Sequence, residues 1–409
     1  MTFFIVPLMQ SRLAKFSSRV NFGVIYYAAM ALILVIGNSS TYIIKFVYPA
    51  FDDDLMTTNI YWLAGMFFFS LGFLFSVSRK IRPNKYLFQL RMNIILILLS
   101  LSIIGTFVAY YYLGFIPFIS GTDTGERYTS YGTITIFNRM WSYCVVAAVL
   151  SFIYIKQIKP LFISKITIVI AILISFFFLI RMYPFLIFVV IFLLWITFEG
   201  KQVKINIIAL ISVIVLSVGN VYFQDYRTGD DTNALQASGQ LNFVQSKIVY
   251  DNFNEFGQLK RAINEYKAEP QYGLTFLSIP LGFIPAPILV PFGVSKSEIQ
   301  SNNSAVLMAK WLQSENSTGI RIGILGELYI NFKHYGCIFM FVIGLLVGYL
   351  QCRINAVQLY DWRLGFYMIF FAISLYMLIG QIDAIGSLLG NYTILFLILK
   401  VLTTKIYKY

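Results

Sequence analysis

The sequence predicts an all-α polytopic membrane protein with about ten transmembrane helices. Of its 409 residues, 58% are hydrophobic and only 12% are charged, and the mean hydropathy is +0.75. A soluble domain of this length does not have such a composition. Apolar runs of about twenty residues recur along the chain, and a helix of that length crosses a hydrocarbon core of roughly 30 Å. Helices satisfy their own backbone hydrogen bonds in lipid, so the spans are expected to be helical.

The apolar runs predict ten spans, which leave one long connection between the seventh and the eighth. They cover residues 21–38, 58–77, 92–113, 135–155, 161–180, 182–198, 204–222, 330–350, 363–380 and 384–403. The alternative is eleven or twelve spans. The long connection divides the chain into a first membrane bundle of about seven spans, a large outer loop and a second membrane segment of about three spans, at residues 1–222, 223–325 and 326–409.

Basic residues in the connecting loops predict the orientation. With a cytoplasmic amino terminus, 18 of the 31 Lys and Arg residues fall in predicted cytoplasmic segments, where only Glu199 and Asp361 are acidic. Basic loops resist translocation, so both termini are expected in the cytoplasm. The net charge of +13 therefore reflects membrane orientation, and nucleic-acid binding is not indicated.

The large outer loop contains an amphipathic segment at residues 241–266. Phe256, Leu259, Ile263 and Tyr266 recur there at helical spacing, with charged residues such as Lys260 between them. This pattern predicts a helix that lies against the membrane or against the span bundle.

A proline-rich apolar stretch follows at residues 272–293, YGLTFLSIPLGFIPAPILVPFG. Its four prolines would disrupt an uninterrupted spanning helix, so the stretch is expected to be re-entrant or interfacial. Irregular backbone at membrane depth needs protein or a water-filled cavity around it, which predicts an outward-facing cavity. The alternative is an eleventh span kinked by proline, which would move the basic carboxyl terminus outside, against the charge rule.

Metal and cofactor sites are not indicated. His334 is the only histidine, and the cysteines at 144, 337 and 352 have no zinc-site spacing, so we interpret them as buried core residues. No glycine-rich nucleotide loop, Ser-His-Asp set or Asp-x-Asp signature is visible, which disfavours a cytoplasmic nucleotide-sugar donor.

Four arginines lie close to outer span ends: Arg127, Arg181, Arg227 and Arg321. A charge near the bilayer needs a partner or a function. Guanidinium groups bind phosphate oxygens bidentately and stay charged, so four of them around one outer cavity would suit a diphosphate. For each arginine the alternative is an anchoring cation or an ion pair with a nearby carboxylate.

Glu327, in the stretch GELYINF, is the leading candidate for a general base, because a hydroxyl acceptor must transfer its proton to a group within hydrogen-bond reach. The alternative is a structural partner for Arg321. Asp225 is a weaker candidate because it lies in a polar stretch. Tyr272 belongs to a set of interfacial aromatic residues that could stack on sugar rings or only anchor the protein in the membrane.

Three stretches together resemble the bacterial oligosaccharide repeat unit polymerases, the Wzy-type O-antigen polymerases. They are GFIPFISGTDTGERYTSYG (114–132), LIRMYPFLIFVVIFLLW (179–195), and the proline-rich stretch followed by GIRIGILGELYINFKHYG (319–336). The resemblance implies a glycosyltransferase C type of fold in the bacterial inner membrane. It also implies a metal-independent glycosyltransferase that transfers a growing glycan from undecaprenyl diphosphate to a second lipid-linked repeat unit at the periplasmic face.

The resemblance assigns roles to the candidate residues. It implies that the four arginines bind the diphosphate. We expect Glu327, Arg321 and Arg181 to be catalytic, and the substrate to contact Arg127, Arg227, Asp225, Tyr272 and His334. The expected partners are the lipid-linked oligosaccharide as donor and acceptor, membrane lipid, and a chain-length regulator protein.

The sequence departs from the family pattern at two positions. Ala286 stands where many relatives have an arginine after the IP of the proline-rich stretch, and Lys333 stands where relatives read NFG. Two other functions remain open. One is an O-antigen ligase, which transfers the glycan to lipid A core and in that family depends on a periplasmic histidine. The other is a transporter or flippase of lipid-linked oligosaccharide, although the chain has no internal repeat and few midplane charges.

Overall fold

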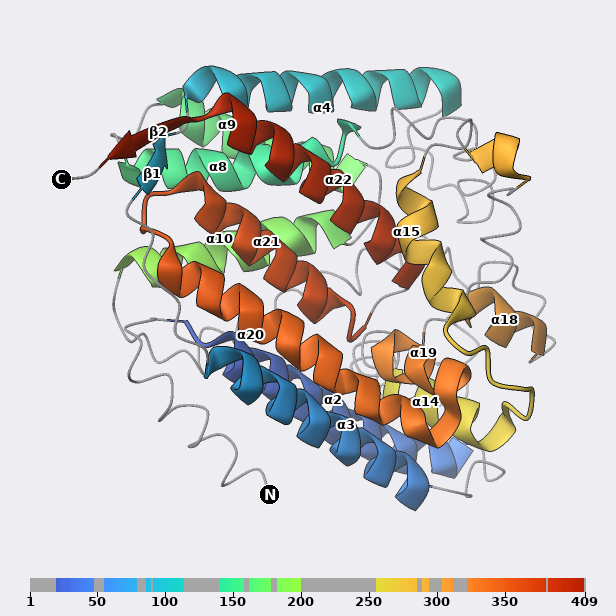
Figure 1. The fold of residues 1–409 in the computed structure, drawn as a ribbon. Helices are drawn as coiled ribbons and strands as arrows, with labels where there is room; N and C mark the ends of the chain where they lie inside the picture. The colour runs from blue at the N-terminus through green and yellow to red at the C-terminus, as the bar shows by residue number, and fades with distance from the viewer. Residues whose placement is uncertain are drawn as a thin grey trace.

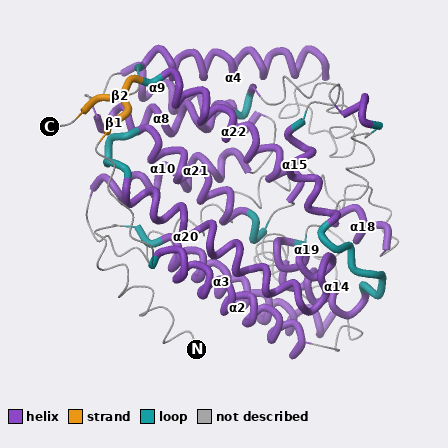
Figure 2. The backbone as a smooth tube through the Cα atoms, viewed as in Figure 1, coloured by secondary structure: helices purple, strands orange, loops and turns teal. Residues whose placement is uncertain are grey.

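The chain is helical, as predicted (Figures 1 and 2). The computed structural model describes residues 20–47, 55–78, 86–89, 91–113, 140–157, 162–177, 182–199, 255–284, 289–293, 304–311, 322–379 and 382–407. Four of the described helical segments are long and apolar enough to cross a membrane: Leu55–Val77, Met92–Tyr111, Met182–Glu199 and Gly323–Ala356. The sequence-based expectation of a helical membrane protein is therefore confirmed at this level.

Three of these segments correspond to α3 (Leu55–Val77), α4 (Met92–Leu113) and α10 (Met182–Glu199). The fourth is the succession of α19 (Gly323–Phe332), η5 (Lys333–Phe339) and α20 (Met340–Ala356). Further apolar helices fall on other predicted spans: α2 (Phe22–Val47), α8 (Tyr143–Gln157), α9 (Phe162–Phe177), α21 (Trp362–Tyr376) and α22 (Ile382–Leu402). The predicted span at 204–222 lies outside the described residues, so the total of ten remains a prediction.

The helix α20 (Met340–Ala356) lies along α3 at very close range (Figure 1). Gly344 faces α3 so closely that a Cβ atom there would lie 2.1 Å from the carbonyl oxygen of Phe69. A Cβ atom on Gly72 would lie 2.0 Å from the carbonyl oxygen of Phe341. Gly344 and Gly348 form a small-xxx-small pair, the pattern that lets two membrane helices approach backbone to backbone.

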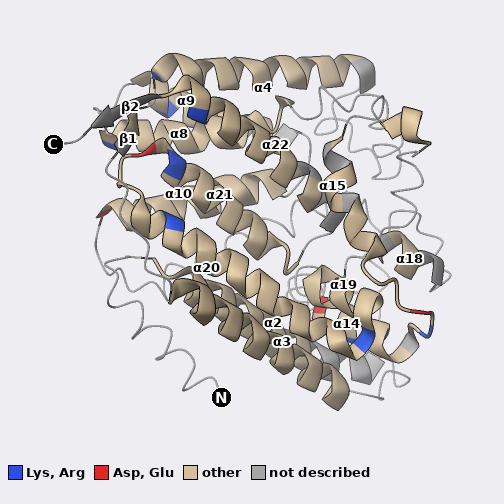
Figure 3. Cartoon of the chain, in the orientation of Figure 1, with Lys and Arg blue, Asp and Glu red and all other residues tan. Residues whose placement is uncertain are grey.

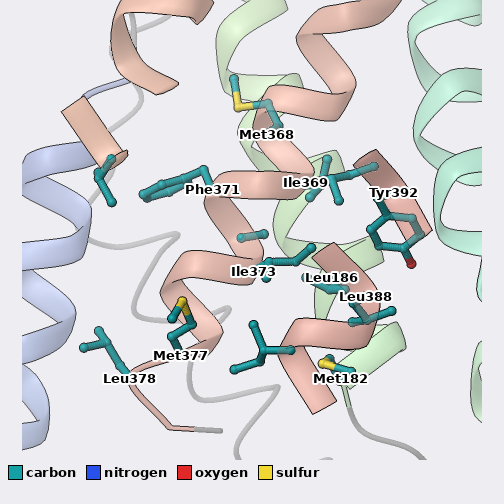
Figure 4. Close-up of a cluster of buried hydrophobic side chains, with 14 of the residues drawn as sticks. Met182, Leu186, Met368, Ile369, Phe371, Ile373, Met377, Leu378, Leu388 and Tyr392 are labelled. Carbon is teal, nitrogen blue, oxygen red and sulfur yellow. The ribbon is translucent and has the colours of Figure 1, made fainter. Parts of the chain in front are cut away.

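The helix α21 lies in the middle of the bundle, between α10 and α22 (Figures 1 and 4). Ile369 and Ile373 of α21 are buried against Leu186 of α10 and Leu388 of α22. On another side of α21, the ring of Phe371 stacks on Phe22 with 3.6 Å between the ring centroids. The core around α21 is therefore built mainly from aliphatic and aromatic side chains.

A two-stranded antiparallel sheet lies at one end of the bundle and was not predicted. Its strands are β1 (Tyr86–Gln89) and β2 (Thr404–Tyr407). The buried carboxylate of Asp361 accepts a hydrogen bond from the backbone N–H of Phe88 at 3.2 Å and pairs with the Arg363 guanidinium at 2.6 Å. The Asp361 side chain also caps α21 by accepting from the backbone N–H of Arg363.

The charged residues of the longer described helices lie towards the helix ends (Figure 3). At the end that holds the sheet, Lys156 of α8 pairs with Glu199 of α10 at 2.7 Å. At the opposite end lie α14 (Glu255–Glu265), α18 (Ser304–Trp311) and α19 (Gly323–Phe332) (Figure 1). All three come from the predicted outer loop or its border with the eighth span.

The part of the amphipathic segment that the structure describes, from residue 255 on, forms α14, which docks on the span bundle; residues 241–254 lie outside the described residues. Phe256 and Leu259 are fully buried, and the Phe256 ring meets Trp62 of α3 edge to face with 5.7 Å between centroids. One detail of the prediction is wrong, because Lys260 is also buried although it was expected on the polar face. The buried face of α14 is therefore wider than the stripe formed by its apolar residues.

The proline-rich stretch forms short pieces. They are η3 (Leu274–Leu277), α15 (Ser278–Phe283) and η4 (Val290–Phe292). The longest described helix between residues 272 and 293 has six residues, as the prolines led us to expect. The helix α15 packs against α22.

Candidate functional site

The helix α19 carries the GELYINF stretch into the protein interior. Gly323 begins the helix with φ +61°, and the N–H of the next residue, Ile324, donates to the carbonyl of Met377 at 2.9 Å. A Cβ atom on Gly323 would lie 2.4 Å from the carbonyl oxygen of Leu378, so only glycine fits this entry. Every residue from Gly323 to Asn331 is buried.

Glu327 is therefore an interior carboxylate, with 2% of the residue exposed. The eighth span was predicted to begin at residue 330, with Glu327 outside its mouth, whereas α19 begins seven residues earlier and includes it. A buried carboxylate needs hydrogen-bond donors to replace water. Two hydroxyl groups supply them.

The two oxygens of Glu327 accept hydrogen bonds from different elements. The Thr275 hydroxyl, on η3, donates to Oε1, and the Ser304 hydroxyl, at the first residue of α18, donates to Oε2. Both donors are themselves buried. The carboxylate thus joins three segments that are far apart in the sequence.

Asn331 extends this network one helical turn along α19. Its Nδ2 donates to the Thr275 hydroxyl at 2.6 Å and to the carbonyl of Glu327 at 2.9 Å, and its Oδ1 accepts from the backbone N–H of Gly273 at 2.9 Å. Both amide hydrogens and the amide oxygen are therefore used. Glu327, Thr275, Ser304 and Asn331 form what we call the Glu327 network.

Backbone hydrogen bonds also join the proline-rich stretch to α19. The N–H groups of Gln271 and Tyr272 donate to the carbonyls of Ile330 and Asn331 at 3.2 and 3.0 Å. The last carbonyls of a helix have no partner within the helix, so this turn satisfies the end of α19. The proline-rich stretch is thereby attached to α19 by backbone and side-chain bonds together.

Two residues in a glycine-favouring backbone conformation flank the network. Tyr272 has φ 47° and Lys333 has φ 51°, and they are the only non-glycine residues with positive φ in the described part of the chain. Such a conformation costs about 1–3 kcal/mol for each residue that carries a Cβ atom. Both strained positions therefore lie where the proline-rich stretch meets the end of α19.

The Lys333 side chain lies against α14 and its carboxyl-terminal end. Its Nζ donates to the carbonyl of Tyr266 at 2.7 Å and lies 4.2 Å from the centre of the Tyr266 ring. Burial raises the pKa of the Tyr266 hydroxyl, while a hydrogen bond from Gln271 lowers it. The phenol stays neutral at physiological pH and presents its ring to the ammonium group.

Lys333→Gly is expected to give a more stable protein than Lys333→Ala, by about 1–2 kcal/mol, because both variants lose the ammonium contacts but only glycine relieves the positive φ. Thermal unfolding of the two purified variants in the same detergent would measure the difference. Equal midpoints, or a higher midpoint for the alanine variant, would show that the backbone at residue 333 is not strained.

Three of the predicted site residues lie in the described part of the chain. Glu327 is at the centre of the network; Tyr272 joins it through its backbone, while 74% of the residue is exposed. His334 is exposed, and its ring meets Tyr329 edge to face with 5.5 Å between centroids. The others lie outside the described residues: Arg127, Arg181, Arg227, Arg321 and Asp225.

Four residues of this region were missed by the sequence analysis as site residues: Thr275, Ser304, Asn331 and Tyr266. Asn331 could have been found, because it follows Glu327 by four positions and shares its helix face. The two hydroxyl residues have no such signal, since they are 52 and 23 positions away from Glu327.

No group of three or more His, Cys, Asp or Glu side chains that could hold a metal ion occurs among the described residues. Comparisons of the chain with protein-family models, with curated proteins and with solved structures find no match.

Proposed function

We propose that this protein is a glycosyltransferase that polymerises undecaprenyl-diphosphate-linked oligosaccharide repeat units at the periplasmic face of the bacterial inner membrane. One observation carries the proposal. The proline-rich stretch and the GELYINF stretch, which both carry the resemblance to O-antigen polymerases, are joined through Thr275, Asn331 and Glu327. Segments that matter jointly for one activity are expected to meet in the folded chain.

Lys333 gives a second, independent support. Relatives read NFG where this chain reads NFK, and Lys333 adopts a positive φ of 51°. A ψ of −136° goes with it, a combination that glycine adopts readily and other residues do not. A family glycine at this position therefore fits the backbone, although this chain has lysine there.

The distribution of the loops also supports the proposal. Residues 86–89, 361–363 and 404–407, all predicted to be cytoplasmic, contact one another at one end of the bundle. The Glu327 network lies towards the other end, with α14 and α18 (Figure 1). An active site that uses a periplasmic acceptor would be expected at the end away from the cytoplasmic loops.

The proposed transfer reaction requires a group that binds the diphosphate and a group that accepts a proton. Arg181 and Arg321, with Arg127 and Arg227, would bind the diphosphate and stabilise the charge that grows on it as it leaves. Glu327 would accept the proton of the acceptor hydroxyl as its oxygen bonds to the anomeric carbon of the donor glycan. The carbon–oxygen bond to the diphosphate breaks, and its electron pair leaves with the diphosphate.

Deleting the gene in the producing strain tests the function. If the protein is a polymerase, the deletion strain is expected to carry surface glycan of one repeat unit. Electrophoresis of the extracted lipopolysaccharide would resolve this glycan as a single short band. A ligase loss would instead leave no glycan on the lipid A core, and a flippase loss would leave repeat units on the cytoplasmic leaflet. Either of these results, or an unchanged glycan ladder, would contradict the proposal.

A further inference from the structure

The two oxygens of Glu327 are held in unequal ways. At Oε1, the Thr275 hydroxyl is fixed by the Asn331 amide at 2.6 Å, and Asn331 is itself fixed by Gly273 and by its own helix. Because the amide nitrogen can only donate, the Thr275 oxygen accepts from Asn331 and its hydrogen points to the carboxylate. This side of the carboxylate is a continuous, satisfied chain of hydrogen bonds.

At Oε2, the Ser304 hydroxyl has less support. Its bond to Glu327 is the one side-chain hydrogen bond that Ser304 makes within the described part of the chain. Ser304 begins α18, an eight-residue helix that contacts the other described elements sparsely, with Met308 as its fully buried anchor. Ser304 can therefore leave Oε2 without breaking any other bond of the Glu327 network.

The Ser304 side chain is a primary alcohol that donates a hydrogen bond to a buried carboxylate. An acceptor sugar must present its hydroxyl to a general base in the same way, with the hydrogen towards a carboxylate oxygen. The chain thus already places an alcohol where the proposed reaction needs one. The Thr275 hydroxyl is a poor candidate for the same exchange because its oxygen is also bonded to Asn331.

We propose that the position of the Ser304 hydroxyl at Oε2 of Glu327 is the acceptor subsite, and that Thr275 and Asn331 are positioning residues that hold Oε1. A hydroxyl of the acceptor sugar replaces Ser304 at Oε2. Its proton passes to Oε2, its oxygen bonds to the anomeric carbon of the donor, and the diphosphate leaves with the electron pair of the broken bond. This inference rests on the proposed function and assigns the acceptor side of the same site.

Removing the two hydroxyls separately tests the assignment, because a purely structural network would suffer in the same way from either loss. Thr275→Val is expected to lower kcat about tenfold with little change in the acceptor KM, since a partly unsatisfied carboxylate is no longer held in place. Ser304→Ala is expected to lower the acceptor KM about tenfold, since an internal competitor that makes one hydrogen bond to a charged group is gone. Thr275→Ser, which keeps the hydroxyl, should recover most of kcat.

The assay uses purified protein in liposomes and the lipid-linked oligosaccharide extracted from the deletion strain as donor. The acceptor is the same oligosaccharide released by mild acid and labelled with a fluorophore at its reducing end. It keeps the nonreducing-end hydroxyls but has no diphosphate, so it cannot act as donor. The lipid-linked donor competes with it as acceptor, so the donor is held at one fixed concentration and the apparent KM of the labelled acceptor is compared between variants.

Thr106→Val is the matched control. Thr106 is a buried threonine of α4, and its hydroxyl donates only to the Ser102 carbonyl of its own helix at 2.8 Å among the described contacts. This variant should keep the wild-type kcat and KM. Size-exclusion chromatography checks folding, and Ser304→Gly replaces Ser304→Ala if the alanine variant aggregates.

Equal losses of kcat in Thr275→Val and Ser304→Ala, or an unchanged or raised acceptor KM in Ser304→Ala, would overturn the acceptor assignment while leaving the proposed function in place. Failure of the wild-type protein to extend the labelled oligosaccharide, with protein that is monodisperse, would count against the proposed function itself. The two failures are therefore distinguishable.

Discussion

Alanine in place of Arg181 or Arg321 is expected to abolish glycan polymer while the protein still inserts into the membrane at its normal level. In the proposed function each guanidinium binds the diphosphate, whose negative charge would grow as the bond to the glycan breaks. Removing one hydrogen-bond donor to an oxygen on which negative charge develops lowers a rate by about 100- to 1000-fold in other enzymes. The lipopolysaccharide ladder of a complemented deletion strain would measure the effect.

Lysine at either position should give partial activity, because it keeps the charge but not the two-pronged hydrogen bonding of arginine. Arg353→Ala is the matched control. Arg353 is an exposed arginine of α20 that bonds the Tyr349 hydroxyl at 2.7 Å, and it lies in a predicted cytoplasmic segment. This variant should give wild-type polymer. Long polymer from both the Arg181 and the Arg321 alanine variants would remove the arginines from the diphosphate site.

The helices that the sequence predicts best are those with uninterrupted apolar runs. The spans predicted at 92–113 and 182–198 agree with α4 (Met92–Leu113) and α10 (Met182–Glu199) to within one residue. A continuous apolar run has one stable arrangement in lipid, so its limits follow from composition alone. The pairing of β1 with β2 had no such signal, because four-residue strands in basic loops lack a distinctive pattern.

The eighth span shows that an apolar run alone does not always predict where a span begins. Its start was predicted at residue 330, which placed Glu327 at the outer mouth of the span. In the structure α19 begins at Gly323 and buries Glu327, since Thr275 and Ser304 supply the two hydrogen bonds that the carboxylate needs. A sequence window around Glu327 contains neither hydroxyl, so no local pattern could have predicted that it is buried.

Only part of the candidate site could be predicted, because only some of its residues have a signal in the local sequence. Glu327 stood out because an ionisable residue beside an apolar run is rare, and Asn331 could have been added from its spacing. Lys333 looked like a simple departure from NFG, and its strained backbone became visible only from φ. The identity of a residue does not reveal the conformation that its neighbours impose on it.

Glu327→Gln is expected to lower the transfer rate by about 100- to 10,000-fold with little change in thermal stability, because glutamine cannot take a proton from the acceptor hydroxyl. Its shape nearly matches that of glutamate. The amide oxygen can accept from one hydroxyl, and the amide nitrogen can donate to the oxygen of the other after that hydroxyl rotates. The three segments joined by the Glu327 network should therefore stay together, and single-turnover transfer in liposomes would measure the loss.

Glu327→Ala separates the two roles of the carboxylate. It leaves the hydroxyls of Thr275 and Ser304 without their acceptor and opens a cavity, so the unfolding midpoint should fall together with activity, by a free energy of about 2–4 kcal/mol. If Glu327 only joins α19 to η3 and α18, the glutamine variant should keep polymer of normal length and only the alanine variant should fail. Loss of transfer in the glutamine variant at an unchanged unfolding midpoint supports the proton-accepting role, because the shape is retained while the negative charge and the ability to take a proton are lost.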